Sequence, residues 1–143
     1  MGLLTGMASL FHLHIDSGEK KLIREEVSLS EAVEAHITWK VRLQSYVDGK
    51  SHENLDPAII CRDDQCRLGA WIHGPALNHF REFGPFHQLR ADHAQFHCLA
   101  ADVVNHVQAN NREAAEAILK GEYQQISHKV VMALTELNSL VTQ

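Results

Sequence analysis

Apolar residues recur at alternating intervals of three and four along most of the chain, which is the spacing of amphipathic helices. The first such stripe begins after Ser28, which forms a capping box with Glu31, and it ends at Gly49. Its members are Leu29, Ala32, His36, Trp39, Leu43 and Tyr46. The pattern therefore predicts a helix over residues 28–49 whose buried face includes a histidine.

A second stripe follows the Gly84-Pro85 break and predicts a helix that continues to about Ala109. Its members are Phe86, Leu89, His93, Phe96, Ala100, Val103 and Val107. Because four residues make just over one helical turn, His97 shares this face with His93. Two buried imidazoles must either be satisfied by hydrogen bonds or coordinate a ligand, and the spacing alone is compatible with both.

The last helix is predicted to run from an Asn110-Asn111 cap to about Thr142. Its inner stripe consists of Ile118, Ile126, Val130, Ala133, Leu137 and Val141. Gly121 lies inside this helix and costs roughly 1 kcal/mol relative to alanine, which favours a local kink at that point.

The segment between the first two helices is too interrupted to form a long helix. Residues 50–58 are predicted to form a polar connection. Only one or two helical turns fit between Cys66 and the Gly74-Pro75 break. We expect this short piece to lie across the others. Its apolar anchors are Leu68, Trp71 and Ile72. Three long helices, a short cross-piece and an N-terminal segment predict an all-α bundle.

The chain divides into an N-terminal arm, residues 1–26, and a helical bundle, residues 27–143. Glycines interrupt the arm, and its residues 11–15 alternate like a short strand or an extended segment. We expect the arm to serve as an interaction or dimerisation segment. His12 and His14 lie in it, but an isolated H-x-H of this kind is not assigned to a metal.

Composition narrows the range of partners and compartments. The formal net charge is −5 and the 13 basic residues are scattered, so we expect neither nucleic acid nor a membrane as a partner. Three irregularly spaced cysteines argue against a secreted disulfide framework and favour the cytoplasm. No apolar run reaches the roughly 18 residues of a membrane span, and no Lys or Arg precedes Asp16, so neither a transmembrane helix nor a signal peptide is expected.

Eleven histidines are unusual for a chain of this size, and four candidate metal ligands stand out by position. They are His36 on the first helix, Cys66 at the cross-piece, and His93 with His97 on the second long helix. Imidazole and thiolate are borderline-soft donors that suit Zn²⁺, and four protein ligands are typical of a closed tetrahedral zinc site.

Three segments resemble the motifs of the chemoreceptor zinc-binding domain family. They are residues 35–39 (AHITW), 66–71 (CRLGAW) and 93–97 (HAQFH), which match that family's H-x-x-W, C-x-x-G-x-W and H-x-x-x-H in order and spacing. Each motif alone is weakly specific, whereas three in this order are specific. The resemblance extends over residues 27–141, and we expect a free-standing member, because neither receptor signalling helices nor a cyclase domain is recognised.

The resemblance implies a four-helix bundle with a short inserted cross helix that carries the cysteine ligand. It also implies a homodimer and one Zn²⁺ per chain. The implied ligands are His36, Cys66, His93 and His97. Family members sense zinc, and some use the zinc-bound cysteine as a redox switch for hypochlorous acid. The signal is then expected to pass by contact to another protein, such as a chemoreceptor or a cyclic-di-GMP pathway protein.

Two other classes of metal site fit the sequence less well. A hemerythrin-like di-iron site that binds O₂ needs bridging carboxylates, for instance as H-x-x-x-E, but the residue four after His36 is Lys40. A zinc hydrolase needs an open coordination position and a general base, and Ala94 stands where an H-E-x-x-H motif has its glutamate. We therefore expect that the protein is not an enzyme. A purely structural or zinc-buffering role is the remaining alternative.

The other cysteines and histidines are assigned minor roles. Cys61 lies five residues before Cys66 and could form a disulfide with it after oxidation, but a bystander role is favoured. Cys98 points about 100° away from the face of its neighbour His97 and is expected to be a small packing residue. The histidines without a partner at ligand spacing are expected to be surface or hydrogen-bonded residues, namely His73, His79, His87, His106 and His128.

Four residues near the ligands have candidate supporting roles. Trp39 and Trp71 are expected to be core walls that shield the metal. Asp92 and Asp102 lie near the second helix's histidines and are candidates for orienting them, but the helical spacing assigns neither.

Overall fold

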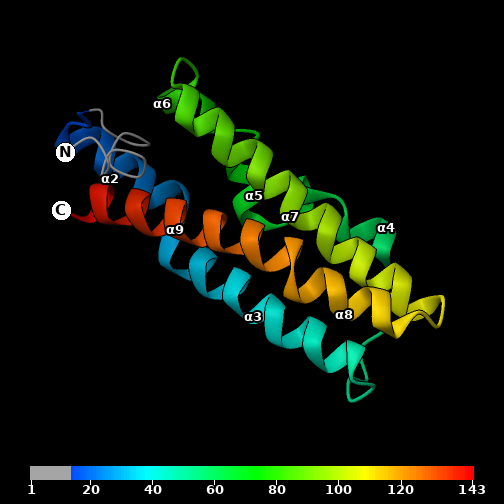
Figure 1. The fold of residues 1–143 in the computed structure, drawn as a ribbon. Coiled ribbons are helices and arrows are strands. Elements are labelled where there is room, and N and C mark those ends of the chain that lie inside the picture. The colour runs from blue at the N-terminus through cyan, green and yellow to red at the C-terminus, as the bar shows by residue number, and fades with distance from the viewer. Residues whose placement is uncertain (1–13) are drawn as a thin grey trace, which may run out of the picture.

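The computed structural model describes residues 14–143, and this part of the chain contains helices and no strands (Figure 1). The longer helices are α2 (Ser17–Glu26), α3 (Leu29–Val47), α7 (Gly84–Gln108), α8 (Arg112–Lys120) and α9 (Glu122–Thr142). The short ones are α4 (Pro57–Ile60), the 3₁₀ turn η2 (Asp63–Gln65), α5 (Arg67–Ile72) and α6 (Leu77–Phe80). The predicted all-α class is confirmed.

The bundle is built from the long helices α3 and α7, the consecutive helices α8 and α9, and the shorter helix α2. α3, α7 and the pair α8–α9 pack against one another, and α2 lies beside the C-terminal part of α9 (Figure 1). The short elements from α4 to α6 connect α3 to α7, and α5 corresponds to the predicted cross-piece. Its predicted anchors are confirmed as buried side chains of Leu68, Trp71 and Ile72.

The caps that the sequence contains set the ends of α3. The Ser28 hydroxyl accepts a hydrogen bond from the Glu31 N–H at 3.3 Å, which is half of the predicted capping box. Gly49 ends the helix region with a φ of +73°, in the left-handed region that glycine adopts without strain. The predicted helix over 28–49 is therefore confirmed within two residues at each end.

Gly121 divides the predicted last helix into α8 and α9. Its φ and ψ of −107° and −103° are not helical. The Gly121 N–H donates a hydrogen bond to the Ala117 carbonyl, and this bond closes α8. Asn111 caps the start of α8 by accepting the Ala114 N–H at 3.3 Å. The kink predicted at this glycine is thus a full helix break.

Part of the predicted arm is helical. Residues 1–13 lie outside the described residues, but Ser17–Glu26 form α2, whose N-cap Asp16 accepts the Glu19 N–H at 2.8 Å. Ile23 of this helix is completely buried. The sequence analysis made no helix prediction for these ten residues, and most of the predicted extended segment, residues 11–15, lies outside the described residues. The interaction role of the arm stays a prediction.

The core is apolar apart from three histidines. Among the described residues, the only buried polar side chains are His36, His93 and His97, with exposed fractions of 3%, 0% and 5%. All three point between α3 and α7, where burying an imidazole demands a partner. In residues 14–143, none of the helices is both long and apolar enough to cross a membrane.

Candidate metal centre

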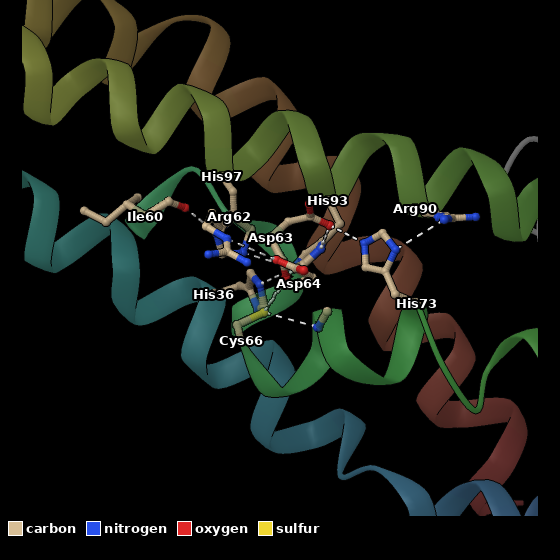
Figure 2. Close-up of polar contacts among 11 residues, drawn as sticks. His36, Ile60, Arg62, Asp63, Asp64, Cys66, His73, Arg90, His93 and His97 are labelled. Carbon is tan, nitrogen blue, oxygen red and sulfur yellow. Dashed lines mark hydrogen bonds and ion pairs between the residues drawn. The ribbon is translucent and has the colours of Figure 1, made fainter. Parts of the chain in front are cut away.

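Four side chains from three separate elements converge at the middle of the bundle (Figure 2). His36 comes from α3, His93 and His97 come from α7, and Cys66 stands at the N-terminus of α5. One ligand atom from each of the four lies within 4.8 Å of the other three. The structure therefore brings together all four residues that the sequence singled out.

His93 Nε2 lies at the centre of the group. It is 3.2 Å from His36 Nε2, 3.2 Å from His97 Nε2 and 3.5 Å from Cys66 Sγ. Bond lengths of about 2.05 Å to nitrogen and 2.3 Å to sulfur in a tetrahedron give edges of about 3.3 Å and 3.5 Å. These three distances match three of the six edges of such a tetrahedron.

The other ring nitrogens fix where the protons are. His36 Nδ1 lies 2.7 Å from the Ala32 carbonyl oxygen, and His97 Nδ1 lies 2.9 Å from the Ile60 carbonyl oxygen. A carbonyl oxygen only accepts, so each Nδ1 carries the proton and donates it. In the neutral rings both Nε2 atoms are then bare lone pairs, directed at His93 Nε2. A neutral His93 carries a single ring proton, so it can donate to only one of these two atoms and at least one lone pair stays without a donor.

The histidines cannot relieve this by becoming charged. Burial lowers the pKa of His93 to about 3, with the adjacent His97 and His36 adding to the effect. Burial likewise lowers the pKa of His36 and of His97. The rings therefore stay neutral near pH 7, and a metal cation bound here would satisfy their converging lone pairs.

Cys66 is held in place by the start of α5. Its Sγ accepts the Gly69 N–H at 3.2 Å, so the side chain caps this short helix. Burial raises the pKa of the Cys66 thiol, and nearby Asp63 adds to the rise. A thiolate ligand therefore depends on a cation beside it. The residue is half-buried and lines two cavities of about 790 and 330 Å³.

Gly69 explains why the cysteine motif contains a glycine. A Cβ at this position would lie 1.7 Å from the Asp63 carbonyl oxygen and 2.7 Å from its carbonyl carbon. Only a residue without a side chain lets α5 pack this closely on η2, and that packing sets the position of Cys66. The motif C-x-x-G is thus a steric requirement of the site.

Asp63 is a carboxylate beside the ligands that the sequence analysis missed. Its Oδ2 is 2.8 Å from His73 Nε2 and 3.6 Å from His93 Nδ1, a buried nitrogen without a hydrogen-bond partner (Figure 2). Arg90 donates to His73 Nδ1 at 3.2 Å, so the His73 Nε2 proton is directed at the carboxylate. Asp63 therefore lies where a carboxylate orients a metal-bound imidazole.

The two aspartates weighed from the sequence do not take this place. Asp92 accepts a hydrogen bond from the Gln88 amide at 3.0 Å, and Asp102 is exposed. Helical periodicity drew attention to residues near His93 and His97. The one available signal for Asp63 was its position three residues before Cys66. Asp63 lies in a short turn, where no periodic pattern predicts which way a side chain points.

We expect Asp63→Asn to weaken metal binding by about 10- to 100-fold, the usual cost of losing a partner that orients a ligand. Asparagine keeps the shape but loses the negative charge that faces His93 Nδ1. Competition against a chromophoric zinc chelator measures the change. Asp64→Asn is the matched control, since Asp64 is exposed and only 3.8 Å from Arg62. Equal losses in the two variants would show that Asp63 does not act on the ligand.

Three of the histidines outside the centre have partners, as predicted. His73 contacts Asp63, and His87 Nε2 donates to the Arg81 carbonyl at 2.8 Å. His79 lies between two carboxylates, with Nδ1 at 2.8 Å from Glu19 and Nε2 at 3.0 Å from Glu26.

The two tryptophans border the two cavities beside the centre. Trp71 is buried, donates to a Glu26 carboxylate oxygen at 3.0 Å and lines the larger cavity. Trp39 is half-buried under the Arg42 guanidinium and lines the smaller one. Their shielding role stays a prediction.

The remaining two cysteines differ from expectation. The Cys61 sulfur lies 3.5 Å from the Cys98 sulfur, and both residues are exposed. Cys98 is therefore not a packing residue, because the turn of α7 that directs His97 inward directs Cys98 to the surface. Cys61 has a thiol neighbour, but that neighbour is Cys98.

The match to known families covers the metal centre. The model of the chemoreceptor zinc-binding domain matches residues 36–104, a range that begins at His36 and includes Cys66, His93 and His97. This segment, 69 of the 143 residues, is similar to that family's domain. No curated protein and no solved structure gave a significant match. The chemoreceptor zinc-binding domain thus accounts for α3 from its eighth residue, the cross-piece and most of α7.

Proposed function

We propose that this protein is a sensory module that binds one Zn²⁺ per chain through His36, Cys66, His93 and His97. The observation that supports this most directly is the set of buried, proton-free Nε2 lone pairs converging beside a cysteine sulfur. The single ring proton of a neutral His93 can satisfy only one of these lone pairs, whereas a cation placed among them would satisfy all of them. Similarity to the chemoreceptor zinc-binding domain points the same way.

Zinc is favoured over a di-iron centre by the donor atoms. Within the described residues, the only cluster suited to a metal comprises three histidines and one cysteine, without a bridging carboxylate. A thiolate with imidazoles suits zinc, whereas di-iron sites need carboxylates. Four protein donors leave no open position for a substrate, so the same set argues against a zinc hydrolase.

Cys66 is the residue through which the site would respond to oxidants. Bound zinc keeps its thiolate deprotonated and so preserves its nucleophilicity. Cys66 Sγ attacks the chlorine of hypochlorous acid, the Cl–O bond breaks and hydroxide leaves; hydrolysis of the S–Cl bond then gives a sulfenic acid and chloride. The sulfenic acid is a poorer donor, so α5 would lose its link through the metal to α3 and α7. That release is the proposed signal.

The output is proposed to pass through protein contact in the cytoplasm. Ile37 and Val41 lie four residues apart on α3 and are 52% and 65% exposed, an apolar pair that suits a homodimer interface. A chemoreceptor or a cyclic-di-GMP pathway protein is the proposed recipient. Analytical ultracentrifugation of the zinc-loaded protein measures the dimer.

Metal content per chain, measured by elemental analysis before and after mild hypochlorous acid, tests the proposal. One zinc per chain, released as Cys66 is oxidised, is the expected result. Chelation should also lower the melting temperature, because ligand binding stabilises the folded state. Zinc that stays bound after Cys66 oxidation would leave a structural or buffering site. Two irons per chain would contradict the zinc assignment.

A further inference from the structure

Cys61 and Cys98 form an exposed thiol pair on the outer side of the α4–α7 contact. Cys61 is the residue that ends α4, and Cys98 lies in α7. Their sulfur atoms are 3.5 Å apart although the residues are 37 positions apart in sequence. To form a disulfide, with its bond length of about 2.05 Å, the two sulfurs must approach each other by about 1.5 Å.

This thiol pair is separate from the metal centre. Cys66 directs its sulfur at His93 and the interior, whereas Cys61 and Cys98 face solvent. Neither of the two joins the metal-binding group found among residues 14–143. The chain therefore presents two sulfur sites of different chemistry: one sulfur among buried imidazoles, and a free dithiol at the surface.

We propose that Cys61 and Cys98 are a redox-active dithiol that closes to an intramolecular disulfide with peroxide-class oxidants. One sulfur, as thiolate, attacks a peroxide oxygen; the O–O bond breaks, the first water leaves and a sulfenic acid forms. The second sulfur attacks that sulfenic sulfur, the S–O bond breaks and the second water leaves. Two thiols lose two electrons and two protons in total, and hydrogen peroxide is reduced to two waters.

The disulfide would act on one zinc ligand. The Ile60 carbonyl accepts the His97 Nδ1 proton at 2.9 Å, and Ile60 and His97 each directly precede one of the two cysteines. A covalent bond between residues 61 and 98 therefore runs beside the hydrogen bond that orients His97. Closing the pair should hold that histidine in its ligand position, so zinc leaves more slowly. This consequence, unlike the disulfide itself, depends on the proposed zinc site.

Tryptic peptide mapping tests the proposal on the full, zinc-loaded chain. Cleavage after lysine and arginine places the cysteines on separate peptides, 51–62, 63–67 and 91–112. Reduced protein is treated with one equivalent of hydrogen peroxide, alkylated and digested. We expect peptides 51–62 and 91–112 to be joined, reactive thiols to fall from three to one per chain, and a reductant to restore all three.

The variants Cys61→Ser and Cys98→Ser should each abolish the joined peptide and keep the fold, because both side chains are exposed. Zinc transfer to a chelator should be several-fold slower after peroxide in the native chain and unchanged in the variants. A cross-link to peptide 63–67, or one formed only between two chains, would overturn the proposal. The metal content of the same samples is measured separately and tests the zinc site. The disulfide can therefore be tested even if the chain holds no zinc.

Discussion

Cys66→Ser is expected to lose zinc affinity by more than about 100-fold, the upper range for residues that merely support a ligand. A serine hydroxyl is a hard, neutral donor and cannot replace a thiolate on a borderline-soft metal. The variant leaves His36, His93 and His97 as a three-nitrogen site. It also removes the sulfur that accepts the Gly69 N–H and caps α5. Competition titration under reducing conditions measures the affinity.

Cys61→Ser is the matched control for that substitution. It makes the same chemical change five residues away, but the Cys61 sulfur faces Cys98 and solvent. In reductant its zinc affinity should equal that of the native chain. If the two variants lose affinity equally, the ligand thiol has been misassigned, and if neither does, the metal is held by the histidines alone.

The four candidate ligands were predictable because each lies in a local sequence pattern. His36, His93 and His97 lie on the same stripes as the apolar residues that build the core, so periodicity places them inside. Cys66 lacks a periodic signal, and the resemblance of its motif to a known family supplied it. Helix boundaries followed from caps, such as Ser28 for α3 and Asn111 for α8.

The features that sequence reasoning missed depend on contacts between elements. Asp63 approaches His93 only because η2 folds back on α7, and a one-turn 3₁₀ helix has no periodicity to read. Cys61 meets Cys98 only because α4 packs on α7. Distance along the sequence favoured Cys66 as the partner of Cys61. In the structure the side chain of Cys61 instead points toward Cys98.

Gly69→Ala is expected to destabilise the zinc-free chain by about 3 kcal/mol, at the upper end of the usual cost of overpacking. The added methyl would overlap the Asp63 backbone carbonyl at 1.7 Å, and no side-chain rotation relieves a clash between a Cβ and a backbone atom. α5 must therefore move away from η2. Because Cys66 begins α5, zinc affinity should fall together with stability. Denaturant unfolding with and without zinc measures both effects.

Gly18→Ala is the control for the glycine-to-alanine change itself. Gly18 lies in the first turn of α2, and a Cβ there meets its nearest neighbour, Asp16 Oδ1, at an ordinary 3.5 Å. Alanine has the higher helix propensity, so this variant should be unchanged or slightly more stable. If Gly69→Ala behaves like Gly18→Ala, the close packing of α5 on η2 does not hold Cys66 in place. The C-x-x-G motif would then need an explanation other than steric fit.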